Sequence, residues 1–254
     1  MGTKINSAYR IYNIFKNNLD TQNEGQQNVE VWSKVFDINE PDHLQKSFRV
    51  LEKLTLLKKE MENSNNLMSN IDISKETYTK VFEALKNVLN PQLLYHPWNT
   101  VKQHMKPDIM NLLKICSELL PDEEELISEE EIEGIKNEIE TLEKHIEGGK
   151  YSDSLKSFVK EQLVLLNTAI SNYKIQGAKA FNQSYYEAHT ILFKNVEVFK
   201  DKDSKILLKK IGSIWNNVLS IYERVSKSYN MLSAGIKLLG GSDSVLDKIN
   251  DIIK

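Results

Sequence analysis

Apolar residues recur every three or four positions along most of the chain, and this spacing constrains the fold more than any other feature. Such a period places apolar side chains on one side of an α-helix, whereas a half-buried strand alternates at every second residue. The most regular stretch contains Ile132, Ile135, Ile139, Leu142 and Ile146. We therefore predict an all-α protein, a multi-helix bundle of about eight to ten helices.

The C-terminal half is expected to contain a long antiparallel helical hairpin. Ser128 and Glu131 have the spacing of a capping box, which predicts a helix beginning directly after Ser128. Gly148 and Gly149 end this helix, and the apolar period resumes after a short connection at residues 155–173. A short connection makes neighbouring helices antiparallel. Gly177 either interrupts the second arm of the hairpin or ends it. The apolar stripe of the first arm could pack against its own hairpin or against another subunit, so a homo-oligomer remains possible from the sequence.

Pro121 ends a predicted helix and divides the chain. We predict an N-terminal helical subdomain at residues 1–121 and a C-terminal hairpin and bundle at residues 122–254, with packing as one domain left open. Within the first part, the residues that mark one face of a first helix are Ile5, Tyr9, Tyr12, Phe15 and Leu19. Residues 31–36 favour a short helix over a strand. A long helix follows, with an apolar series of Leu44, Phe48, Leu51, Leu54, Leu57 and Met61.

Charge is unevenly distributed along the chain, although the net charge is only −3. Between Glu118 and Glu147 there are 13 acidic residues against Lys136 and Lys144. Most of these carboxylates fall opposite the apolar stripe, where a solvated helix face accounts for them, and Glu140 is spaced to pair with Lys144. A face of one sign also steers a partner of opposite charge. The predicted contacts to a protein with a basic surface are Glu129, Glu130, Glu133 and Glu140.

Nucleic acid and metal ions are not expected as ligands. Residues 194–254 carry 11 Lys and Arg against 7 Asp and Glu, a smaller excess than a nucleic-acid-binding surface needs. None of the five histidines lies three or four residues from another, and there is one cysteine, so no metal-ligand pattern is present. We therefore predict no metal and no cofactor.

The best candidates for catalysis are Tyr185 and His189, which share a helix face and could direct a phenol and an imidazole into one cleft. Aromatic residues at this spacing more often fill a core. His96 and Trp98, in a turn framed by prolines, are a second pair. Cys116 has no local sign of activation and is predicted to be a buried thiol. An enzyme with a cryptic pocket in the bundle therefore remains an alternative to a non-enzymatic protein.

The segment Met231–Lys254 has amphipathic helical spacing, with Leu232, Ile236 and Leu239 followed by a second apolar series. It would pack on the bundle, contact a partner or dock at a membrane, and these alternatives stay open. A membrane helix normally has a denser basic face, so a membrane partner is not expected. Without a secretory signal or an apolar run long enough to span a bilayer, the chain is expected to be soluble and cytoplasmic.

These observations favour a non-enzymatic protein-protein interaction protein, such as an adaptor, inhibitor or regulatory subunit. The alternatives are a membrane-docking or membrane-inserting helical protein and an enzyme. Heavy use of Asn, Lys and Ile is typical of an AT-rich genome, which suggests a bacterial or phage-related system.

Overall fold

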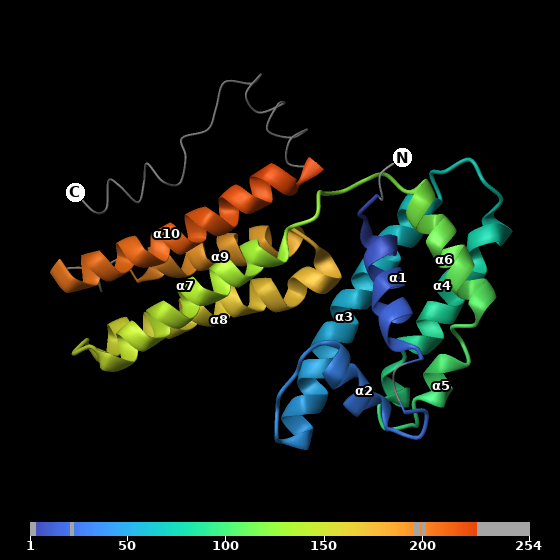
Figure 1. Cartoon of the computed structure of the whole chain (residues 1–254), viewed down its shortest axis with the longest axis horizontal. Helices are drawn as coiled ribbons and strands as arrows, with labels where there is room; N and C mark the ends of the chain where they lie inside the picture. The colour runs from blue at the N-terminus through green and yellow to red at the C-terminus, as the bar shows by residue number, and fades with distance from the viewer. Residues whose placement is uncertain (1–3, 21–22, 196–198, 200–201, 228–254) are drawn as a thin grey trace. The chain divides into compact units, whose positions relative to one another are not determined.

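The computed structural model describes residues 4–20, 23–195, 199 and 202–227. Within these residues it contains ten α-helices, one short 3-10 helix and no β-strand, which confirms the predicted all-α fold (Figure 1). The helices form two compact units. The first unit comprises Met1–Glu124 and Lys174–Gly177, and the second comprises the remaining described residues. The first unit thus extends to Glu124, whereas the boundary expected from the sequence is at Pro121. Residues 174–177 also belong to the first unit.

The first unit is built from α-helices packed around an aromatic centre. Trp32 stacks on Phe36 and makes edge contacts with Phe15 and Trp98, with ring centroids 5.4 to 5.8 Å apart. Helix α1 contacts α3 and α6, and α4 also packs on α6. The elements are α1 (Ser7–Asn18), α2 (Asn28–Val35), α3 (His43–Met68), α4 (Lys75–Val88), the 3-10 helix η1 (Pro91–Leu93), α5 (Asn99–Lys102) and α6 (Pro107–Leu119).

The buried faces of α1 and α3 differ from those that the apolar period predicts. In α1 the core residues include Ala8, Ile11 and Phe15, whereas Tyr9 and Tyr12 are half-buried. In α3, Leu44 and Phe48 are 60% and 52% exposed, so the apolar series does not mark a fully buried face. The apolar residues of α3 extend over a wider part of its surface than the neighbouring helices cover. The packing of those helices therefore decides which apolar residues of α3 are buried.

The second unit contains four long helices, namely α7 (Glu129–Gly148), most of α8 (Asp153–Gln176), α9 (Lys179–Lys194) and α10 (Lys202–Val225). Helices α7 and α8 run in opposite directions, and α8 forms a tightly packed antiparallel pair with α9 (Figure 1). Helix α10 packs on α7 and α9. The predicted antiparallel arrangement in the C-terminal half is therefore confirmed. The predicted stripe residues that are buried are Ile135, Ile139, Leu142 and Ile146.

The predicted start of α7 is also confirmed. Ser128 Oγ accepts a hydrogen bond from the Glu131 backbone N–H at 3.2 Å, and the Ser128 N–H donates to Glu131 Oε2 at 3.1 Å. This reciprocal capping box satisfies two N–H groups that would otherwise lack partners at the helix start. The local sequence thus determines where α7 begins.

Gly177 ends α8 and leads directly into α9. Its φ angle is +65°, in the left-handed region that other L-residues rarely adopt. A Cβ atom at this position would overlap the Glu124 carboxylate. The alternative in which the helix continues through Gly177 is therefore excluded.

Among the described residues, no helix is both long enough and apolar enough to cross a bilayer. The segment Met231–Lys254 lies outside the described residues. Bundle packing, partner binding and membrane docking therefore remain alternative predictions for this segment.

Candidate functional site

The acidic side of α7 is exposed to solvent. Helix α7 carries eight glutamates and two lysines, and the four predicted partner-binding residues are all exposed, namely Glu129, Glu130, Glu133 and Glu140. Two of them form ion pairs along the helix, Glu133 with Lys136 at 3.3 Å and Glu140 with Lys144 at 3.5 Å. The second of these pairs was expected from the spacing. Exposed pairs of this kind contribute about 0.2–1 kcal/mol, so a basic partner can compete for these carboxylates.

Tyr185 and His189 lie together on α9, as the sequence predicts, but their rings pack against each other. The ring centroids are 4.6 Å apart in an edge-to-face arrangement, and Nδ1 of His189 is buried without a hydrogen-bond partner among the described residues. Burial, with smaller contributions from Tyr186 and Glu223, raises the pKa of Tyr185. Burial lowers the pKa of His189. At neutral pH the phenol is therefore protonated and the imidazole neutral.

The second pair of candidates, His96 and Trp98, is not gathered into one cleft. Trp98 is buried in the aromatic centre of the first unit, and His96 is exposed. The turn that holds them docks on the start of α2, because the N–H groups of Asn28 and Val29 donate to the carbonyl oxygens of His96 and Leu94. This turn supplies hydrogen-bond acceptors for the first N–H groups of α2, which have no partner within the helix.

The same turn presents Tyr95 beside α3. The Tyr95 and Ser47 hydroxyl oxygens are 2.8 Å apart, and Leu44 and Phe48 lie on the same side of α3 as Ser47. Leu44, Phe48 and Tyr95 are each more than half exposed, at 60%, 52% and 57%. We refer to these three residues as the Tyr95 patch. The apolar spacing includes Leu44 and Phe48 but does not indicate that Tyr95 joins Ser47 on α3, because that contact forms only through packing.

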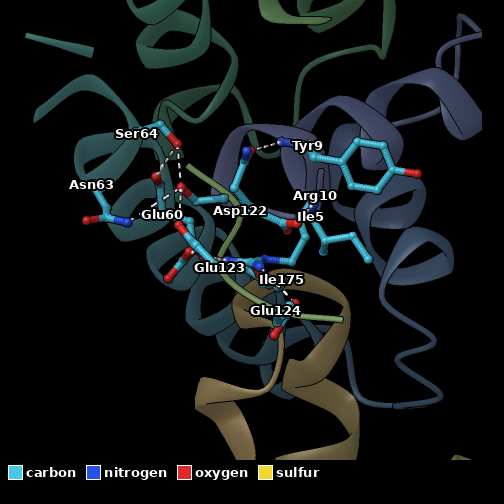
Figure 2. A network of polar contacts seen from close by, with 12 residues as sticks. Ile5, Tyr9, Arg10, Glu60, Asn63, Ser64, Asp122, Glu123, Glu124 and Ile175 are labelled. Carbon is cyan, nitrogen blue, oxygen red and sulfur yellow. Dashed lines mark hydrogen bonds and ion pairs between the residues drawn. The ribbon is translucent and has the colours of Figure 1, made fainter. Parts of the chain in front are cut away.

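Arg10 forms a buried ionic network in the first unit (Figure 2). Its guanidinium donates to Glu60 at 2.9 Å, Glu123 at 2.8 Å and Glu124 at 2.9 Å, while Nε donates to the Ile175 carbonyl oxygen at 3.0 Å. Burial lowers the pKa of Arg10, but the three carboxylates together raise it above its ordinary value. The network joins α1 and α3 to residues 123–124 and to the end of α8.

The side chains of this network are almost completely buried. The Arg10 side chain is only 7% exposed, and the three glutamate side chains are between 5% and 13% exposed. Within the described residues, no group of three or more His, Cys, Asp or Glu side chains is placed to hold a metal ion. Cys116 is buried as predicted, and burial raises its pKa to about 11, so the thiol is not activated.

A scan of known family models, a search of curated proteins and a search of solved structures each found no match to this chain.

Proposed function

We propose that this chain is a non-enzymatic interaction protein that binds a protein partner through the Tyr95 patch. The observation that carries this proposal is the exposure of three large apolar side chains around Ser47. Exposed apolar patches mark interaction sites, and residues that dominate binding energy are often aromatic and lie at the centre of an interface. Phe48 and Tyr95 supply that aromatic character, and Leu44 adds aliphatic surface.

The patch is held in place before a partner arrives. Tyr95 is anchored to α3 through Ser47, and its turn is hydrogen-bonded to the start of α2. A preorganised surface loses less conformational entropy on binding. Charged residues of α3 and α2 near the patch are paired, Lys46 with Glu30 at 3.1 Å and Arg49 with Glu52 at 3.3 Å. An apolar centre with polar surroundings is the usual composition of a protein interface.

The acidic side of α7 is proposed as a second contact, to a basic surface of the partner. Exposed charges change association rates and salt dependence more than they change affinity. The Tyr95 patch is therefore expected to determine whether the partner is retained, and α7 to determine how strongly salt weakens the complex.

We expect Phe48→Asp to reduce retention of a stoichiometric partner at least tenfold, because it removes an aromatic anchor and would bury an unpaired charge in the interface. The measurement is quantitative affinity purification of the tagged full chain from its native host. Val164→Asp is the matched control, since Val164 is 63% exposed on α8 in the second unit. Equal recovery of every partner with both variants would contradict the proposal.

Replacing Glu129, Glu130, Glu133 and Glu140 together by lysine is expected to reduce partner recovery several-fold at low salt. At high salt the variant and the unmodified protein should recover similar amounts, because exposed charges are screened. The same purification, repeated at the two salt concentrations, gives the measurement. If recovery is unchanged at low salt, α7 is not a contact, and the Tyr95 patch would be the remaining surface.

A further inference from the structure

Helix α9 carries a row of ring side chains that is open to solvent. Tyr186, His189 and Phe193 follow one another at intervals of three and four positions, so they lie on one face of the helix. Tyr186 is 62% exposed and Phe193 is 49% exposed, whereas His189 is half-buried between them. The ring centroids of His189 and Phe193 are 6.1 Å apart. We refer to these three residues as the α9 aromatic face.

Half-buried residues of α10 border this face. His189 and Asn216 line the same small cavity, and Tyr185 is in edge-to-face contact with Trp215, with ring centroids 6.1 Å apart. Leu219 lies one turn beyond Asn216 and is also half-buried against the core of the second unit. Exposed apolar surface that is bordered by polar residues usually marks a contact with another segment or molecule.

The chain itself supplies a segment that suits an apolar surface. Helix α10 ends at Val225, and 27 residues follow Lys227. Gly240 and Gly241 divide these residues into two parts, and each part has an apolar series spaced four and then three positions apart. Such spacing is typical of an amphipathic helix. The two series are Leu232, Ile236 and Leu239, and Val245, Ile249 and Ile252.

This segment is long enough to reach the α9 aromatic face. Helices α9 and α10 run in opposite directions, so a chain that turns back along α10 passes Tyr186 before Phe193 (Figure 1). Leu208, which lines the same cavity as Leu192, lies about 26 Å from Val225 at the rise of an α-helix. The 27 residues after Lys227 span about 40 Å in the same conformation. Because the segment is tethered, even a weak contact can keep it bound.

Charge favours the same direction. Lys205 and Lys209 lie one turn apart in the first half of α10, towards the Phe193 end of the face. Before Gly240, the segment after Lys227 has a single charge, at Lys237, whereas after Gly241 three aspartates outnumber two lysines. A segment that turns back along α10 therefore brings its acidic part to the lysines of α10, and opposite charges attract within a screening length of about 8–10 Å. The aspartates are Asp243, Asp247 and Asp251.

We propose that residues 231–253 fold back on the second unit and cover the α9 aromatic face, with their apolar side chains against Tyr186 and Phe193. This contact lies within one chain and within the second unit. It does not depend on the proposed binding of a partner at the Tyr95 patch, which belongs to the first unit.

Hydrogen–deuterium exchange of the purified full chain, followed by mass spectrometry, tests this proposal. Backbone amides of residues 245–253 should exchange at least about tenfold more slowly than in a synthetic peptide of the same sequence. Phe193→Asp and Tyr186→Asp should each return these amides nearly to the peptide rate, because an aspartate would be buried without a partner. Ile249→Asp should have the same effect without a change in the four-helix unit. Val164→Asp is the matched control, since Val164 is 63% exposed on α8 in the same unit.

Exchange at the peptide rate in the unmodified chain would overturn the proposal, as would slow exchange that neither α9 variant changes. Slow exchange that appears only at high protein concentration would assign the segment to a second copy of the chain. Slow exchange that appears only with anionic lipid vesicles would assign it to a membrane. Either of these results also overturns the proposal. Phe48→Asp should leave the exchange of residues 245–253 unchanged, so this test and that of the proposed function can fail separately.

Discussion

Replacement of Arg10 by methionine is expected to lower the free energy of unfolding of the first unit by about 3–5 kcal/mol. The substitution leaves the carboxylates of Glu60, Glu123 and Glu124 buried without the guanidinium that now contacts all three. It also removes the hydrogen bond to the Ile175 carbonyl oxygen. Removal of one partner from a buried ionic group is far more costly than loss of an exposed pair, because the remaining charges cannot return to water.

Urea denaturation of the full chain, monitored by tryptophan fluorescence, measures this loss through Trp32 and Trp98 in the aromatic centre of the first unit. The matched control is Arg49→Met on α3, since the Arg49 side chain is 64% exposed and its pair with Glu52 should contribute less than about 1 kcal/mol. Arg10→Lys should fall between these two variants, because lysine keeps the charge but cannot present the planar fork that meets several acceptors. Similar stabilities for Arg10→Met and Arg49→Met would show that the network contributes little.

The destabilisation caused by Arg10→Met is also expected to depend on pH. At neutral pH the three glutamates are left with uncompensated negative charge. As the pH is lowered into the range where carboxyl groups bind protons, that charge is neutralised, and the difference in stability from the unmodified protein should shrink. Denaturation curves of both proteins at neutral and acidic pH give this comparison directly.

Replacement of Gly177 by alanine is expected to lower the free energy of unfolding by at least about 3 kcal/mol. The left-handed backbone conformation costs an alanine about 1–2 kcal/mol. In addition, the new Cβ would overlap the Glu124 carboxylate and displace it from Arg10, with which it pairs at 2.9 Å. Rotation of the Glu124 carboxylate would relieve the overlap, but it would break the contact with Arg10.

Two further variants separate the causes. Gly177→Asn should be less destabilising than Gly177→Ala if the backbone angle dominates, because asparagine tolerates the left-handed region, and equally destabilising if the overlap with Glu124 dominates. Gly134→Ala is the control within a helix, and it should stabilise the chain by about 0.5–1 kcal/mol because nothing lies near its added Cβ. The prediction fails if Gly177→Ala unfolds at the same urea concentration as the unmodified protein.

Local sequence determined the parts of this protein that depend on neighbours within one helical turn. The spacing of Ile135, Ile139 and Leu142 placed them on a buried face, and Ser128 with Glu131 marked the start of α7. The same spacing places Glu129 and Glu130 on the opposite side of α7, where they are exposed. These features are predictable because helix periodicity and capping act between residues three or four positions apart.

Tertiary structure decided the features that bring distant segments together. Arg10 meets partners 50, 113, 114 and 165 residues away, and no spacing within the sequence indicates such contacts. Leu44 and Phe48 belong to the same apolar series as Leu54 and Leu57, yet only the latter pair is covered by neighbouring helices. Tyr185 and His189 were predicted to share a face, but the cavity beside them also depends on α8 and α10. A helical pattern specifies which side chains lie on one face, and the packing of other segments decides which of those faces are buried, which remain exposed and where a gap is left.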